Sequence, residues 1–211
     1  FMNKLSKNLN NAFTYVEEKY NVQNVIVSTS LEPGEGEHKL FDFLRKNNFK
    51  QDNVALYGLD SDLIMLSIFH MGYCNNIYNF REAPEFIKNS LPVNVKSNDP
   101  NEPYFLDIKC LCDNILVEMR CADNDMYRVY DYVFLCFFLG NDFLPHFPSM
   151  NIRTHGIDSL LSIYSKEIGK ITNNFLINKE NQNIVWKNVK KIIKTIASNE
   201  QKYMLEEYQS R

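Results

Sequence analysis

Apolar residues recur at helical spacing in the first part of the chain, interrupted by one short apolar run. In Phe1–Tyr20 they stand at positions 1, 2, 5, 9, 13 and 16, which predicts a surface helix with one apolar face. The Val-Ile-Val run in Asn24–Ser30 is bounded by polar residues and predicts a short buried strand. Proline and glycines in Leu31–Gly36 end this run, and Glu37–Lys46 returns to helical spacing. The expected order is therefore strand, acidic loop and helix.

The same order is repeated directly afterwards. Val54–Leu59 predicts a second strand, Leu63–Phe69 an apolar helix, and Asn76–Phe80 a third strand. Alternation of strands and helices favours an α/β fold with a largely parallel sheet flanked by helices. In such sheets ligands bind beyond the carboxyl ends of the strands, where both acidic loops of this region are expected.

The second half of the chain has a different pattern. Leu91–Pro103 contains three prolines among polar residues and predicts an exposed loop. Helical periodicity follows it in Leu106–Met119, Tyr130–Leu139, Gly156–Tyr164 and Ile184–Tyr203. We therefore predict three parts: residues 1–90 as an α/β domain with acidic loops, residues 91–105 as a loop, and residues 106–211 as a helical region.

Composition narrows the class of protein only moderately. The 211 residues are 45% hydrophobic with a net charge of −3, which is typical of a packed globular protein and excludes a disordered chain. The longest apolar run, Val133–Leu139, is too short to cross a bilayer, and the five cysteines have no zinc-type spacing. We expect an intracellular protein, cytoplasmic rather than nuclear. Because the chain begins with Phe1 inside an amphipathic pattern, we also expect it to be part of something longer.

Five acidic residues provide the candidate chemistry. Glu35 and Glu37 stand in Pro-Gly-Glu-Gly-Glu-His-Lys, Asp60 and Asp62 in Tyr-Gly-Leu-Asp-Ser-Asp-Leu, and Asp142 in Gly-Asn-Asp-Phe-Leu-Pro. Each motif follows the end of an apolar run. Two carboxylates about 4 Å apart repel by roughly 4 kcal/mol at an effective dielectric constant near 20, so a cluster needs protons or cations. If the motifs converge, the chain binds divalent metal.

A structural role is the alternative for each motif taken alone. Acidic residues at Glu35, Glu37 and Asp60 suit the N-termini of the helices that follow, through capping and the helix dipole. Asp142 lies in an apolar segment, where we expect a buried or half-buried carboxylate that needs a partner.

Three such motifs together favour a metal site over three independent caps. Hard oxygen ligands without a histidine or cysteine cluster indicate Mg²⁺ or Mn²⁺, and a carboxylate cage for two ions is the usual apparatus of phosphodiester hydrolysis. The sequence thus predicts a two-metal hydrolase in which Glu35, Glu37, Asp60, Asp62 and Asp142 are both metal ligands and catalytic residues.

At these motifs the chain resembles the Xrn family of 5′→3′ exoribonucleases. The motifs in question are Pro33–Lys39, Tyr57–Leu66 and Phe138–His146, with further likeness at Phe80–Glu82, Phe105–Ile108 and Ile152–Asp158. The resemblance implies a PIN- or flap-nuclease-like fold and a Mg²⁺-dependent enzyme that degrades single-stranded RNA with a 5′-monophosphate to mononucleotides. It also implies that further metal-site and 5′-phosphate-binding residues precede Phe1, so the isolated fragment is expected to be inactive.

The sequence leaves two alternative functions open, and it contains further residues that could contact RNA. A flap-type, structure-specific DNA nuclease would use the same carboxylates, and a catalytically silent RNA-binding or scaffold protein would use none. His38 and Lys39 follow the acidic loop and could contact phosphate, although a structural or solvated role is favoured. Four lysines share one face of a helix, where a solvated face is favoured over a stripe that binds the RNA backbone; they are Lys187, Lys190, Lys191 and Lys194.

Overall fold

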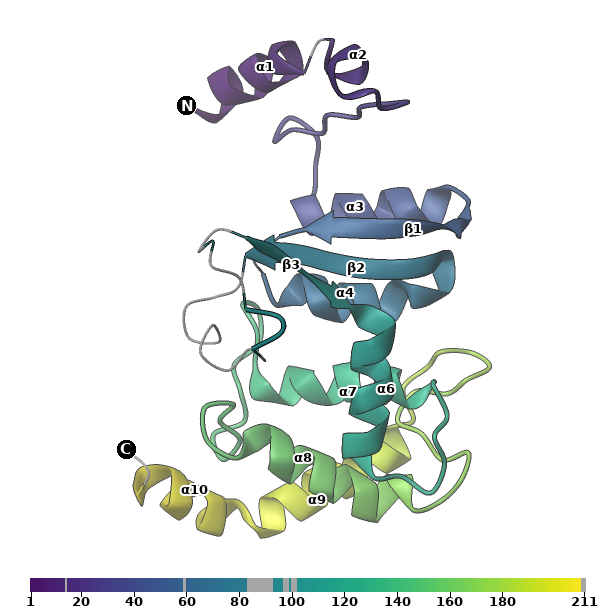
Figure 1. Cartoon of the computed structure of the whole chain (residues 1–211). Coiled ribbons are helices and arrows are strands. Elements are labelled where there is room, and N and C mark those ends of the chain that lie inside the picture. Colours follow the sequence, from purple (N-terminus) through teal and green to yellow (C-terminus); the bar gives the residue numbers. More distant parts are fainter. Residues whose placement is uncertain (14, 59, 83–92, 97–98, 100–101, 210–211) are drawn as a thin grey trace. The chain divides into compact units, whose positions relative to one another are not determined.

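The computed structural model describes the chain from residue 1 to residue 209, apart from residues 14, 59, 83–92, 97–98 and 100–101 (Figure 1). It forms two compact units, residues 1–50 and residues 51–211, which we describe separately. In the described part, no helix is both long and apolar enough to span a membrane.

The first unit contains the helices α1 (Met2–Ala12), α2 (Val16–Tyr20) and α3 (Gly36–Lys46). The single helix predicted for residues 1–20 is therefore divided. The reason lies at Tyr15, whose φ of 66° is left-handed and cannot continue a right-handed helix. The prediction for residues 37–46 is confirmed, because α3 begins one residue earlier and ends at the same residue.

The strand predicted for Asn24–Ser30 is wrong. The segment has no regular secondary structure, and Ile26 in the middle of the apolar run is 62% exposed. A strand needs a neighbouring backbone for its hydrogen bonds, and the described residues place none beside this segment. Instead, the Val25 amide donates to the side chain of Glu17 at 2.9 Å.

The second unit contains most of a three-stranded sheet in the order β1-β2-β3, formed by β1 (Phe49–Tyr57), β2 (Cys74–Glu82) and β3 (Pro103–Asp107). The helix α4 (Asp62–His70) and the short helix η1 (Met71–Tyr73) connect β1 to β2. The predicted strand–helix–strand order is confirmed here (Figure 1).

Side-chain and backbone contacts show the direction of β1 relative to β2. In the middle of β1, the side-chain oxygen of Asn53 accepts hydrogen bonds from Asn75 and Asn76, which lie near the start of β2. Beyond the end of β1, the amide of Gly58 donates to the carbonyl of Phe80 near the end of β2. Both strands run in the same direction from the first of these contacts to the second, so they are parallel, as expected for a crossover through α4.

The pattern of the sequence does not predict the strand β3. β3 is antiparallel to β2, with Phe105 opposite Phe80, so the sheet is mixed rather than largely parallel. The sequence pattern predicts a loop up to residue 105 and a helix from Leu106, because Leu106 matches the spacing of that helix. An edge strand with several exposed residues directly before a helix gives no clear period of two.

One face of the sheet is packed against α4. Ser67 of α4 donates a buried hydrogen bond of 2.8 Å to the side chain of Asn79 in β2, beside the buried Ile68 and Ile77. The ring of Phe80 in β2 contacts Tyr57 of β1 and Phe105 of β3, with centroid distances of 5.4 and 4.8 Å.

The rest of the second unit is helical, as predicted (Figure 1). The predicted Ile184–Tyr203 helix is divided at Asn199, and the predicted Tyr130–Leu139 helix ends in a short 3₁₀ turn. The elements are α6 (Ile108–Met119), α7 (Arg128–Cys136), η2 (Phe137–Leu139), α8 (Gly156–Tyr164), the π-helical η3 (Ser165–Gly169), α9 (Trp186–Ser198) and α10 (Glu200–Gln209).

A fully buried arginine lies at the centre of this helical part. Arg128, the first residue of α7, donates twice to the carboxylate of Asp123, at 2.6 and 2.9 Å. It also donates to the Tyr164 hydroxyl at 2.9 Å and to the carbonyls of Asn174 and Ile171. These contacts use all five N–H donors of the guanidinium group, which is what burial of this charge requires.

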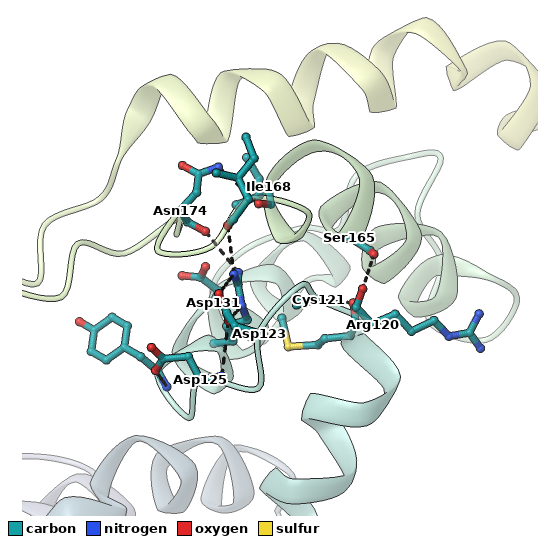
Figure 2. Close-up of polar contacts among 12 residues, drawn as sticks. Arg120, Cys121, Asp123, Asp125, Asp131, Ser165, Ile168 and Asn174 are labelled. Carbon is teal, nitrogen blue, oxygen red and sulfur yellow. Dashed lines mark hydrogen bonds and ion pairs between the residues drawn. The ribbon is translucent and has the colours of Figure 1, made fainter.

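The hydroxyl of Tyr164 extends the network to a buried carboxylate. It donates at 2.6 Å to Asp131, which also accepts from the amides of Leu176 and Ile177 at 2.8 and 2.9 Å. Burial raises the pKa of Asp131 to about 6, although these donors and the Arg128 charge act in the opposite direction. Figure 2 shows polar contacts in this region, with Asp123, Asp131 and Asn174 among the labelled residues. The network joins α7, α8 and the chain at residues 171–177.

Replacing Tyr164 by phenylalanine tests the contribution of this network to stability. We expect Tyr164→Phe to lower the free energy of unfolding by about 1–3 kcal/mol, because it leaves a buried donor and a buried acceptor each without one partner. Denaturant unfolding would measure the loss. Tyr208→Phe is the matched control, since Tyr208 is 80% exposed, and a similar loss in both variants would contradict the expectation.

Candidate metal-binding and catalytic site

The first acidic pair lies at the beginning of α3. Glu35 precedes the first helical residue, but its side chain makes no capping hydrogen bond, and Glu37 lies half-buried in the first turn. The Glu35 carboxylate lies 3.6 Å from the imidazole of His38, and both side chains are more than half exposed. The capping alternative for Glu35 therefore finds no support in its contacts, while Glu37 is placed favourably against the helix dipole.

Lys39 fixes the acidic loop from within. Its ammonium group donates to the carbonyl of the buried Thr29 at 2.8 Å, and its aliphatic stem passes Gly34. Gly34 has a φ of +101°, a conformation that favours glycine, so the loop turns where no side chain is present. These contacts give Lys39 a structural role, whereas His38 is exposed next to Glu35.

The second acidic pair follows β1. Asp60 is exposed, and its carboxylate accepts from the amide of Asp62 at 3.3 Å, across the residue that precedes α4. Asp62 is the first residue of α4, where a negative charge is favourable, and Leu63 beside it is buried. The structure thus brings this pair together at a helix start, and Asp60 has a cap-like contact as well as an exposed carboxylate.

The third motif is a tight turn after η2. Gly140 has a φ of +86°, and a Cβ atom there would lie 2.7 Å from the backbone nitrogen of His146. The side-chain oxygen of Asn141 accepts from the amides of Phe143 and Leu144 at 3.0 and 2.7 Å. The Asn141 amide donates to the Leu144 carbonyl at 2.9 Å and closes the turn. Glycine and asparagine are therefore required by the local geometry.

The expectation that Asp142 is buried or half-buried is wrong. Asp142 is exposed, and Phe143 next to it is 72% exposed. The apolar residues of this motif lie at the surface because Asn141 satisfies the backbone groups of the turn without help from the core. The turn presents the carboxylate of Asp142 outward.

The predicted ligands are divided between the two units. Glu35 and Glu37 belong to the first unit, and the three aspartates belong to the second. Within the described part of the second unit, no group of three or more histidine, cysteine, aspartate or glutamate side chains could hold a metal ion, so Asp142 does not join Asp60 and Asp62 there. Convergence of the five acids stays a prediction.

The chemistry of the available donors nevertheless fits a hard cation. Asp60, Asp142 and Glu35 are exposed carboxylates on short, locally fixed segments, and oxygen ligands of this kind suit Mg²⁺ or Mn²⁺. His38, a softer donor, lies beside the Glu35 carboxylate. The residues therefore suit the predicted ions in donor type.

Two family models match the chain in sequence order. Residues 1–82 match the XRN 5′-3′ exonuclease N-terminus, and residues 123–211 match the Xrn1 helical domain. The first match contains the acidic pairs at the starts of α3 and α4, and the second contains Asp142 and the buried network around Arg128. The chain belongs to the Xrn family of 5′→3′ exonucleases.

Curated relatives agree with this family. The chain is 32% identical to 5′-3′ exoribonuclease 2 of Cryptococcus neoformans var. neoformans serotype D, over 76% of this chain and 18% of that protein. It is 30% identical to the Arabidopsis thaliana protein of the same name, over 82% of this chain and 20% of the relative. The Candida albicans protein is 33% identical over 68% and 17%. The chain thus spans about a fifth of the length of these relatives.

Sequence reasoning missed the residues that hold the third motif in place. Arg128 and Asp131 lie three residues apart in an otherwise apolar helix, and this was the available signal, because charges at such positions need buried partners. Their partners come from residues 123, 164 and 171–177, whose proximity no local pattern reveals.

A substitution in the turn tests whether its shape matters. Gly140→Ala places a Cβ atom against the His146 backbone at positive φ, so we expect a loss of about 1–3 kcal/mol in the free energy of unfolding. Thermal or denaturant unfolding would measure it. Gly72→Ala is the control, because no atom lies within 4 Å of its added Cβ position, and equal stability of the two variants would refute the requirement for glycine at 140.

Proposed function

We propose that this chain is part of an enzyme that hydrolyses single-stranded RNA from a 5′-monophosphate end and releases mononucleotides. The observation that carries the proposal is the presence of all three acidic motifs in a chain of the Xrn family, with exposed carboxylates on turns and helix starts. The named activity of the curated relatives, 5′-3′ exoribonuclease, supports the direction and the RNA substrate.

The proposed cofactor is a pair of Mg²⁺ or Mn²⁺ ions. Glu35, Glu37, Asp60, Asp62 and Asp142 would hold them, and the all-carboxylate donor set supports this choice. When bound, such ions lower the pKa of an attacking water and stabilise the leaving oxygen of the phosphodiester.

The chain's own residues orient the ligands. Gly140 and Asn141 fix the turn that presents Asp142, and Lys39 anchors the loop that carries Glu35 through its bond to Thr29. Pre-organised ligands reduce the rearrangement required on binding, which is a main role of protein groups around a metal.

The proposed organisation retains the predicted parts. Residues 1–90 would be the later portion of the nuclease domain, residues 91–105 a loop, and residues 106–211 the helical region that supplies Asp142. We propose that the isolated chain has little or no activity, because it spans only about a fifth of the length of its curated relatives. A cytoplasmic role in RNA decay is part of the same proposal.

Exchange of one carboxylate for an amide tests the catalytic role. In the full-length protein we expect Asp60→Asn to reduce release of mononucleotides from 5′-phosphorylated RNA by about 100-fold or more, because the amide removes a charged ligand without changing shape. Rates would be measured on end-labelled RNA with Mg²⁺. Asp52→Asn, an exposed change within β1, should leave the rate unaltered.

The same assay separates the rival functions. Faster cleavage of flapped DNA than of single-stranded RNA would indicate a structure-specific DNA nuclease. RNA turnover that is unchanged in Asp60→Asn would remove the catalytic claim and favour a silent RNA-binding protein.

A further inference from the structure

One face of α9 carries an unusual concentration of positive charge. Val189, Ile192 and Ile196 are buried against the helical part, while Lys187, Lys190 and Lys194 are exposed. At 1.5 Å of rise per residue, the three exposed lysines extend over about 10 Å of the helix. We call the exposed surface formed by Trp186, Lys187, Lys190 and Lys194 the α9 basic face.

The lysines of this face repel one another within the chain. Lys190 has Lys187 and Lys194 as neighbours at three and four residues, and no acidic residue stands within four positions of any of the three. Like charges at these spacings destabilise a helix. Among the described residues, no carboxylate forms an ion pair with any of the three.

Other helices of the same protein have the usual arrangement for a solvated face. On α3, Asp42 forms ion pairs with Arg45 and Lys46, and on α10 Lys202 pairs with Glu206. Mixed charges at helical spacing stabilise a surface that contacts only water. The α9 basic face departs from this pattern, so a solvated face is a poor explanation of it.

The charge is also segregated along the chain. Residues 165–199 contain seven lysines and two glutamates, a net charge of +5, in a chain whose net charge is −3. The remaining residues therefore carry −8 in total. A local field of this sign attracts polyanions, although the whole protein is acidic.

An exposed aromatic ring lies in the same surface. Trp186 is 61% exposed at the beginning of α9, and Lys190 and Lys194 follow it at successive steps of four residues. A tryptophan face stacks on nucleic-acid bases, while ammonium groups bind the phosphates of the same strand. An acidic protein surface would use the lysines but would not require this aligned ring.

We propose that the α9 basic face binds the sugar-phosphate backbone of single-stranded RNA, with Trp186 stacking on a base. This inference rests on the proposed RNA substrate and adds a binding surface that contains none of the five acids. It gives the lysines an anionic partner that relieves their mutual repulsion.

Binding without catalysis tests the proposal. We would titrate the chain into a fluorescein-labelled oligouridine in EDTA at about 0.1 M salt and follow fluorescence anisotropy. The double variant Lys190→Gln/Lys194→Gln should bind on the order of tenfold more weakly, and the slope of log K against log salt should fall by about 1.4, since each lost phosphate contact contributes about 0.7. Trp186→Ala should weaken binding while leaving the salt slope unchanged.

A matched control separates this face from net charge. Lys109→Gln/Lys202→Gln removes two exposed lysines from α6 and α10 and should bind RNA as the unaltered chain does. Equal weakening in both double variants, or unchanged affinity and slope in Lys190→Gln/Lys194→Gln, would overturn the proposal. Thermal unfolding should show no loss of stability in the α9 variant, because the substitutions remove like-charge repulsion.

The rival occupants are tested in the same series. If the chain bound phosphatidylserine vesicles through Lys190 and Lys194 but did not bind RNA, the partner of the α9 basic face would be a membrane and the proposal would be overturned. The use of EDTA keeps this result independent of the metal site. Weaker RNA binding by the α9 variant would support this inference even if Asp60→Asn left RNA turnover unchanged. Unchanged RNA binding by the α9 variant would contradict this inference but not the proposed catalytic function.

Discussion

The helical part of this protein depends on the burial of one charged group, the guanidinium of Arg128. A buried guanidinium is tolerable only when its donors are satisfied, and here Asp123, Tyr164 and two carbonyls accept all five. This requirement brings together α7, α8 and residues 171–177, which lie far apart along the chain. The turn that carries Asp142 follows α7 through η2, so its position derives from the same constraint.

The candidate ligands combine exposed carboxylates with fixed backbones. Asp142 is presented by a turn that Gly140 and Asn141 close, and Asp60 lies between a sheet strand and a packed helix. Such acids remain hydrated, so they avoid the desolvation cost of buried charges and stay available to hard cations.

Periodicity predicted the elements that bury an apolar face of their own. The helices α3, α4 and α8 and the strand β2 fall in this class, because their packing follows from local spacing. It failed at Asn24–Ser30, whose apolar run has no neighbouring strand, and at β3, which is an exposed edge strand. Motif residues could be named from the sequence, but the exposure of Asp142 and the partners of Arg128 arise from contacts between residues far apart in the chain.

The central claim is that the acidic motifs share one divalent-metal site. Titration of the isotope-labelled full-length protein with Mn²⁺, followed by NMR line broadening, tests it most directly. The account predicts that amide signals near Glu35, Asp60 and Asp142 broaden together at the same low Mn²⁺ concentration, before those near the exposed Asp52 and Asp158. Broadening confined to one motif, or equal at the two control aspartates, would contradict it.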